Sequence, residues 1–284
     1  MNPIKTVTEI IAVVMAFLMG LTATINSLFN GDIYPYESNT RTVGLETFTR
    51  SQGVTTDGES WIFSGDGRLT KVSLDGETEI ASNKKALAEF ERYGSDHIGG
   101  ISYYDGKVYA SVEDGDSFAY PIVAVYDSET LEFTGKYKVI STDILFRGCP
   151  WVCCDAQRGV FYVGNSRNCT EIYAFDIETM EYKKTIPLGS EIFKIQGAEM
   201  YDGYMLAATN DSTRAVYALN VETGKYEKMF DRIMYVPRLI DNFGGEGEDI
   251  TVLAMEDGTL FHALDIGALF IDSNLRHYKP IEEK

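Results

Sequence analysis

The sequence predicts an all-β protein, a β-propeller of about five four-stranded blades. The chain of 284 residues contains 18 Tyr and 15 Phe but only 7 Pro, a composition that favours strands. Short similar segments recur along it. They are marked by aspartates at intervals of 47–50 residues, a period typical of propeller blades, and these aspartates are Asp57, Asp105, Asp155, Asp202 and Asp249.

The first half of each repeat is a short strand, an Asp-Gly turn and a second strand. Residues 52–63, 100–111 and 197–208 are the clearest copies. The copy at 155–163 has a longer turn, and the one near Asp249 is the loosest because no glycine follows the aspartate. Each copy is therefore expected to form the first hairpin of a blade.

The second half of each repeat is an alternating strand, an Asp/Asn-x-Glu-Thr turn and another strand. It occurs in full at 122–137, 171–189 and 215–228, and in shorter form at 69–78 and 260–267. Alternation of apolar and polar residues indicates half-buried strands. Asp, Asn and Thr side chains can hydrogen-bond nearby backbone, which favours a tight turn at this point.

Segment 171–189 resembles the YVTN-type repeat of the quinoprotein-like propellers, whose consensus runs strand, Asp-x-x-Thr, strand, Thr-Ile-Pro-x-Gly. The resemblance covers most of residues 50–270 and implies blades arranged around a channel, but it specifies no activity. Radial closure explains the repeat, because it removes most exposed sheet edges. A sixth blade, or closure by pairing of segment 41–50 with a C-terminal strand near 268–277, stays open.

The N-terminal region predicts that the protein is located outside the cytoplasm. An apolar run without charge spans residues 10–21 and follows Lys5, which is the pattern of a signal peptide or a membrane anchor. We therefore expect 1–30 to be a signal peptide or transmembrane helix that leaves the body outside the membrane. Residues 31–50 are a predicted connector, and 51–284 are the predicted propeller.

Charge and cysteine content restrict the partners. The net charge of −18 excludes a nucleic-acid-binding class, which requires a basic surface. Cys149, Cys153, Cys154 and Cys169 lie in one short stretch without a Cys-x-x-Cys pair, so a zinc ribbon is not expected. Local disulfides and free buried thiols both stay open.

The candidate binding residues precede the first hairpin of each repeat, where the chain approaches the channel. In four of the five repeats a polar side chain lies beside or near a glycine, which leaves room for a ligand. Trp151 could stack on a ligand or fill the core. The predicted channel-mouth residues are Gln52, Asp96, His97, Trp151, Gln196, Glu199, Glu246 and Glu248.

Two function classes fit this constellation. The first is a module outside the membrane that binds a ligand, a protein or a glycan. The second is an enzyme in which Glu199, Glu246 and Glu248 hold Ca²⁺ or another divalent cation, since hard cations prefer oxygen ligands. Propeller lactonases resemble this arrangement in their metal site. Propeller glutaminyl cyclases resemble it in the Gln-Gly pairs at Gln52 and Gln196.

Overall fold

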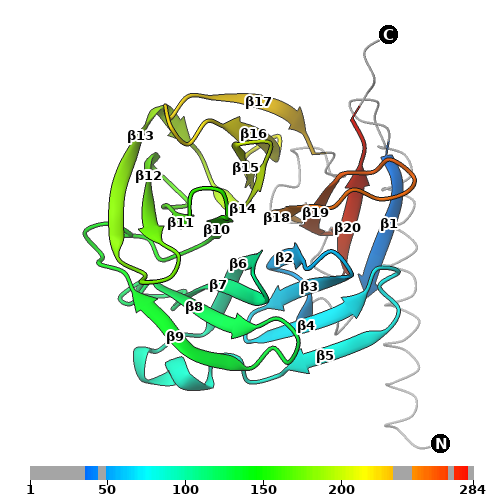
Figure 1. Ribbon diagram of the computed structural model, residues 1–284, viewed down its shortest axis with the longest axis horizontal. Helices are drawn as coiled ribbons and strands as arrows, with labels where there is room; N and C mark the ends of the chain where they lie inside the picture. The colour runs from blue at the N-terminus through cyan, green and yellow to red at the C-terminus, as the bar shows by residue number, and fades with distance from the viewer. Residues whose placement is uncertain (1–35, 44–48, 233–244, 268–271, 281–284) are drawn as a thin grey trace, which may run out of the picture.

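The computed structural model describes residues 36–43, 49–232, 245–267 and 272–280. Within these ranges it contains five four-stranded sheets arranged around a central axis (Figure 1). The predicted all-β propeller of five blades is therefore confirmed. The predicted hydrophobic helix within residues 1–30 lies outside the described residues. No helix in the described residues is long and apolar enough to cross a membrane.

Four blades are continuous segments in which the strands follow one another from the axis outwards. Blade 1 contains β2 (Gly53–Thr56), β3 (Ser60–Gly65), β4 (Arg68–Ser73) and β5 (Glu79–Asn83). Blade 2 contains β6 (His97–Tyr104), β7 (Lys107–Glu113), β8 (Ile122–Asp127) and β9 (Phe133–Val139). Blade 3 contains β10 (Val152–Asp155), β11 (Val160–Val163), β12 (Cys169–Asp176) and β13 (Tyr182–Ile192). Blade 4 contains β14 (Ile195–Tyr201), β15 (Tyr204–Thr209), β16 (Ala215–Leu219) and β17 (Tyr226–Asp231).

Blade 5 joins the two ends of the chain. It contains β18 (Glu246–Val252), β19 (Phe261–Ile266), β20 (Asp272–Tyr278) and, as its outer strand, β1 (Tyr36–Val43). β1 pairs with β20 in antiparallel register, with Thr40 opposite Leu275. Closure by N- and C-terminal strands was one of the alternatives left open, with 41–50 as the N-terminal partner. The observed strand begins earlier, at Tyr36, within the segment predicted as a connector.

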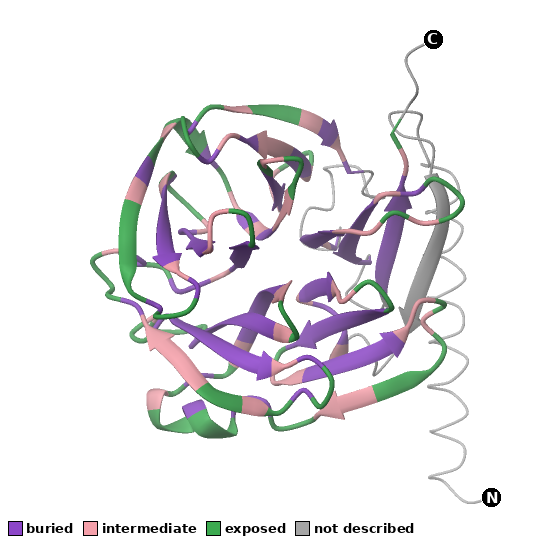
Figure 2. Cartoon of the chain, viewed as in Figure 1, coloured by how far each residue is buried: buried purple, intermediate pink, exposed green. Residues whose placement is uncertain are grey.

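The blades pack against one another around the axis. The inner strands β2, β6, β10, β14 and β18 contact each other in that order, and β18 meets β2 to complete the ring. Apolar clusters fill the space between blades, as where Trp151 and Cys153 of blade 3 meet Ile195 and Ala198 of blade 4. Inner strands are largely buried, whereas the outer strands β5, β9, β13 and β17 are mainly intermediate or exposed (Figure 2). The inner strands are enclosed by neighbouring blades on both faces.

The antiparallel order gives the propeller two different faces. We call the turn face the side that carries the β2–β3 and β4–β5 turns and their equivalents in the other blades. We call the mouth face the opposite side, which carries the β3–β4, β7–β8, β11–β12 and β15–β16 loops and the connections between blades. Because each inner strand begins at the mouth face, residues at the starts of these strands lie there, among them Gln52, His97 and Glu246.

The second-half turns form as predicted on the turn face. The Asp127 carboxylate accepts the backbone N–H groups of Glu129 and Thr130 at 3.1 and 2.8 Å. Asp176 and Asn220 make the equivalent pairs of bonds in blades 3 and 4. The Asp/Asn-x-Glu-Thr motif thus fixes the second hairpin through side-chain to backbone hydrogen bonds.

One repeat position differs from its prediction. Asp249 does not occupy a turn, because it lies within β18 and is fully buried at the axis. The β18–β19 turn is instead formed by Asp257 and Gly258, where Gly258 has a φ of +86° and Asp257 accepts the Thr259 N–H at 2.9 Å. No glycine follows Asp249 in the sequence, and the turn of this hairpin lies later in the chain, at Asp257 and Gly258.

All four cysteines are buried and free. The structure therefore has free thiols where the sequence also allowed local disulfides.

Candidate functional site

A polar pocket of about 320 Å³ opens at the mouth face over the central axis. All five blades or the connections beside them contribute to it, and most of its side chains are polar or charged. The lining residues are Gln52, His97, Gly99, Glu113, Phe118, Arg147, Pro150, Ser166, Arg167, Lys194, Gln196, Asn210, Glu246 and Glu248.

Asp249 closes the axis below this pocket. Its Oδ2 accepts the backbone N–H groups of Val54 in blade 1 and Ile101 in blade 2, at 3.1 and 3.0 Å, and its Oδ1 accepts that of Ile250 at 2.8 Å. Burial raises the pKa of Asp249, and these three donors act in the opposite direction. A Cβ at Gly197 would lie 1.8 Å from Oδ1, so only glycine fits beside this carboxyl group.

Glu248 is the most deeply buried charged side chain of the pocket. It is 2% exposed, and its Oε1 has no hydrogen-bond partner among the described residues. Burial raises its pKa well above the usual value, and the neighbouring Glu246 acts in the same direction. Arg232 holds the backbone of Glu248 in place through a bond to its carbonyl oxygen at 3.3 Å. The carboxyl group is therefore positioned but unsatisfied.

Glu113 is a second buried carboxyl group, at the end of β7. It is 8% exposed, and its Oε2 also has no hydrogen-bond partner in the described part of the chain. Burial raises the pKa of Glu113 to about 7, although a hydrogen bond from the Cys149 backbone acts to lower it. A Cβ at Gly148 would lie 1.9 Å from Oε2, so glycine lets the connection between blades 2 and 3 pass this carboxyl group.

Phe118 forms the wall of the pocket beside Glu113. It has a φ of +53°, which is unusual for a bulky residue. Asp114 stabilises this conformation by accepting the N–H groups of Phe118 and Ala119, each at 3.0 Å. Strained backbone of this kind is common at binding sites, where surrounding contacts hold it.

Three cations line the other side of the pocket. Arg147 and Arg167 are exposed and Lys194 is partly exposed. None of the three makes an ion pair with a described residue. They are available to an anionic group of a ligand.

Five of the eight predicted site residues line the pocket: Gln52, His97, Gln196, Glu246 and Glu248. His97 lies 3.7 Å from the Asp66 carboxylate through its Nδ1, and burial lowers its pKa against the attraction of that carboxylate.

The three other predicted residues do not line the pocket. Asp96 is exposed and accepts the Gly115 N–H at 2.9 Å. Trp151 is fully buried in the apolar cluster between blades 3 and 4, so it fills the core. Glu199 lies further along its strand, beyond the axial Asp249, where its Oε2 accepts the Thr251 hydroxyl at 3.4 Å. Burial raises the pKa of Glu199 to about 8.

The separation of Glu199 from Glu246 and Glu248 bears on the metal hypothesis. No group of three or more His, Cys, Asp or Glu side chains within the described ranges could hold a metal ion. The divalent-cation site stays a prediction without a matching geometry.

The sequence missed the pocket residues that come from loops within the blades and between them. Glu113, Phe118, Arg167 and Asn210 lie on or beside the second-to-third strand loops, which share the mouth face with the start of each inner strand. These loops are not repeated in sequence. The signal that could have found them is the antiparallel order, which places both kinds of connection on one face.

Comparison with known proteins finds similar folds but identifies no family. No family model matches the sequence, and no curated protein matches it. The glutaminyl cyclase of Myxococcus xanthus is similar in structure, with a TM-score of 0.59 and 11% identity over 87% of this chain and 97% of that chain. The Pan2 WD40 domain of Neurospora crassa has a TM-score of 0.40 and 8% identity over 81% of this chain and 64% of that chain. The YVTN-type resemblance stays a prediction, and the chain is a five-bladed β-propeller.

Proposed function

We propose that this β-propeller is a binding module that holds a small polar ligand at the mouth of its channel and acts outside the membrane. The main supporting observation is a pair of buried carboxyl groups on the wall of a polar pocket, Glu113 and Glu248. One oxygen of each has no hydrogen-bond partner among the described residues. A buried polar atom without a partner costs roughly 1–3 kcal/mol. A ligand that donates hydrogen bonds to these oxygens would recover part of that cost.

The shape of the pocket agrees with this proposal. Its volume of about 320 Å³ lies at the lower end of the range for small-molecule sites. Asp249 and the crowded inner strands form a rigid floor. A preformed site of this kind loses little entropy when it binds a ligand.

Binding can be tested on the purified full-length chain by calorimetric titration with amino acids, uronic acids, dicarboxylates and neutral sugars. We expect at least one compound to bind, and Glu248→Gln to weaken that binding by about tenfold or more. Glu129→Gln on the turn face makes the same chemical change far from the pocket and should leave the affinity as it is. Absence of binding by all compounds would contradict the proposal.

The location outside the membrane rests on the apolar run at 10–21. Protease added to intact producing cells should degrade the propeller, whereas a cytoplasmic control protein should survive. Protection of both would contradict this location.

A second candidate function is an enzyme that transfers a proton. Glu113 favours it, because a carboxyl group with a pKa of about 7 is suited to acid–base chemistry near neutral pH. The Myxococcus structure is named as a glutaminyl cyclase, and peptides with N-terminal glutamine are therefore one substrate to try, together with esters and lactones. Turnover that Glu113→Gln abolishes would favour the enzyme, and turnover unaffected by it would exclude this role.

A further inference from the structure

The charges of the pocket are divided between two sides of the propeller. Arg147 belongs to the connection from blade 2 to blade 3, Arg167 to the β11–β12 loop, and Lys194 to the connection from blade 3 to blade 4. Glu246 and Glu248 belong to the start of β18 in blade 5. Blade 4 separates the cations from these two carboxyl groups. The side that carries Arg147, Arg167 and Lys194, which we call the positive side, also contains Glu113, whose pKa is raised to about 7 by burial. We call the side of Glu246 and Glu248 the negative side.

The positive side is unusual in this chain. Acidic residues outnumber basic ones by 43 to 25, yet Arg147, Arg167 and Lys194 gather at one opening. None of them forms an ion pair within the described residues. Unpaired cations at the rim of a cavity attract and orient an anion, and arginine in particular matches a carboxylate.

The negative side requires a donor. Glu248 lines the pocket and is 2% exposed. Its Oε1 atom is buried and has no hydrogen-bond partner among the residues described. Glu246 lines the same wall. Arg232 lies behind Gly247 and acts against the burial that raises the pKa of Glu248, but its side chain is fully buried and does not line the pocket. Two adjacent carboxyl groups on the pocket wall favour a ligand ammonium group over a second anion.

Neutral groups lie between the two charged sides. Gln196 accepts the Ser166 hydroxyl at 3.1 Å, and Asn210 accepts the Gly247 N–H at 3.2 Å. Each amide still has its NH₂ donors, because these bonds use only the oxygen atom. The middle of the pocket therefore offers hydrogen bonds without net charge.

We infer that the ligand is a small zwitterion, an amino acid or a close relative that carries an ammonium and a carboxylate group on one molecule. The inference rests on the proposed function and names the ligand class of the same site. The carboxylate would contact Arg147, Arg167 and Lys194, and the ammonium would contact Glu246 and Glu248. A volume of about 320 Å³ accommodates a free amino acid.

The test is a titration of the full-length chain with each of the common amino acids, followed by blocked forms of the best binder. The N-acetyl form lacks the ammonium charge, and the C-terminal amide lacks the carboxylate. We expect each block to weaken binding by about tenfold or more. Equal affinity for either blocked form would overturn the inference, because the ligand would then be recognised through one charge only.

Two variants locate the charges. Glu248→Gln should weaken binding of the free amino acid by about tenfold but leave binding of the N-acetyl form nearly unchanged, because that form has no ammonium to lose. Arg167→Gln should show the opposite pattern, with the amide form unaffected. Variants that weaken all forms equally would contradict the assignment of the two sides.

The outcome also separates this inference from the proposed function. Binding of uronic acids, dicarboxylates or neutral sugars without binding of any amino acid would overturn the zwitterion and retain the binding module. Absence of binding by every compound would contradict both.

Discussion

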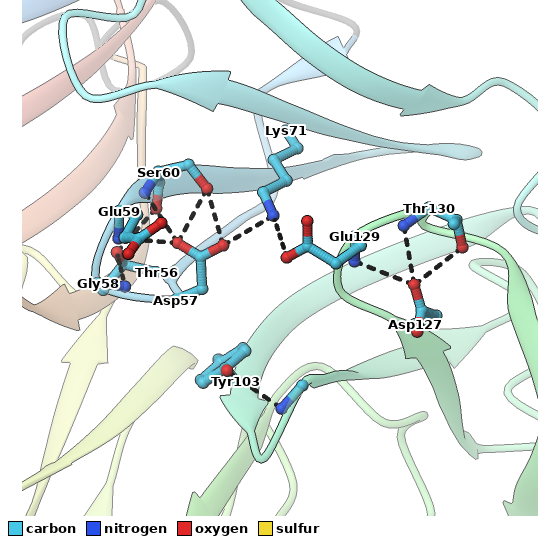
Figure 3. Close-up of polar contacts among 11 residues, drawn as sticks. Thr56, Asp57, Gly58, Glu59, Ser60, Lys71, Tyr103, Asp127, Glu129 and Thr130 are labelled. Atoms are coloured by element: carbon cyan, nitrogen blue, oxygen red, sulfur yellow. Dashed lines mark hydrogen bonds and ion pairs between the residues drawn. The ribbon is translucent and has the colours of Figure 1, made fainter.

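Buried carboxyl groups of the turn face and of the mouth pocket differ in their partners. On the turn face, Asp57 accepts hydrogen bonds from the backbone of Glu59 and Ser60 and from Lys71 at 2.8 Å (Figure 3). Burial alone would raise its pKa, but these bonds hold the pKa of Asp57 below its usual value. On the mouth face, Glu248 is more deeply buried and has an oxygen without a partner.

The turn-face ion pairs stabilise the fold, whereas the carboxyl groups of the pocket are candidates for ligand binding. Turn-face cations link blades 1 to 2, 2 to 3 and 3 to 4. Lys71 reaches Glu129 at 2.8 Å, Lys136 reaches Glu178 at 3.6 Å, and Arg158 reaches Glu222 at 2.9 Å. The partners of these acids are supplied by the protein. On the mouth face, Glu113 and Glu248 each have one oxygen without a partner among the described residues. A ligand that donates hydrogen bonds could satisfy these oxygens.

The largest expected effect is loss of a cation on the turn face. Lys71 is 5% exposed as a side chain and pairs with Asp57, which is 10% exposed. Lys71→Met leaves this carboxylate without its cation, and we expect the free energy of unfolding in urea to fall by roughly 3 kcal/mol. Lys183→Met is the control, because the side chains of the Lys183–Asp176 pair are 45% and 25% exposed and the pair should contribute less than about 1 kcal/mol. Equal losses of unfolding free energy in Lys71→Met and Lys183→Met would contradict the distinction between the buried and the more exposed ion pair.

The next effect is a pH dependence on the mouth face. Burial raises the pKa of Glu113 from 4.5 to about 7, so the folded state favours the protonated form. Stability from this group is present below pH 4.5 and is lost as the pH rises through about 7. We expect Glu113→Gln to remove about 2.5 kcal/mol of this decline between pH 5 and pH 8.

Urea unfolding at both pH values measures this decline. Glu129→Gln, which changes an exposed turn-face carboxylate, should keep the wild-type profile. A Glu113→Gln profile parallel to the wild type would show that Glu113 is already satisfied within the fold.

A smaller effect is expected at the repeated turns. Asp127→Ala removes the acceptor of the Glu129 and Thr130 N–H groups, and we expect a loss of about 1 kcal/mol in the free energy of unfolding. Asp127→Asn keeps an equivalent oxygen and should lose less. Ligand affinity, measured by titration, should be the same in both variants, and a change would mean that the two faces are coupled.

The smallest effect is expected at Glu129. Its side chain is 76% exposed, so Glu129→Gln should lower the free energy of unfolding by less than about 0.5 kcal/mol. Thermal unfolding measures this change, with wild type as the reference. A loss as large as that of Lys71→Met would mean that Glu129, rather than Asp57, is the important partner of Lys71.

The sequence predicted the blades well because repetition and turn chemistry are local. Asp127, Asp176 and Asn220 each bond backbone two and three residues ahead, so their role can be inferred from the motif. Asp249 was assigned to the wrong position, because its three partners include Val54 and Ile101 of other blades. Those contacts exist only after the ring has closed.

The sequence predicted only those residues of the candidate site that follow from the repeat. Gln52, Gln196, Glu246 and Glu248 begin inner strands, and the repeat phase placed them at the channel. Glu113, Arg147 and Lys194 lie in segments of unequal length that do not repeat, so their positions depend on how each blade meets the next.

The sequence by itself determined the all-β class, the period of the blades and the chemistry of their turns, since these depend on neighbours within a few residues. Only the tertiary structure decided which carboxyl groups are buried without partners and which cations face them. Burial and pairing depend on contacts between blades that are far apart in the chain, and closure of the ring brings those contacts together.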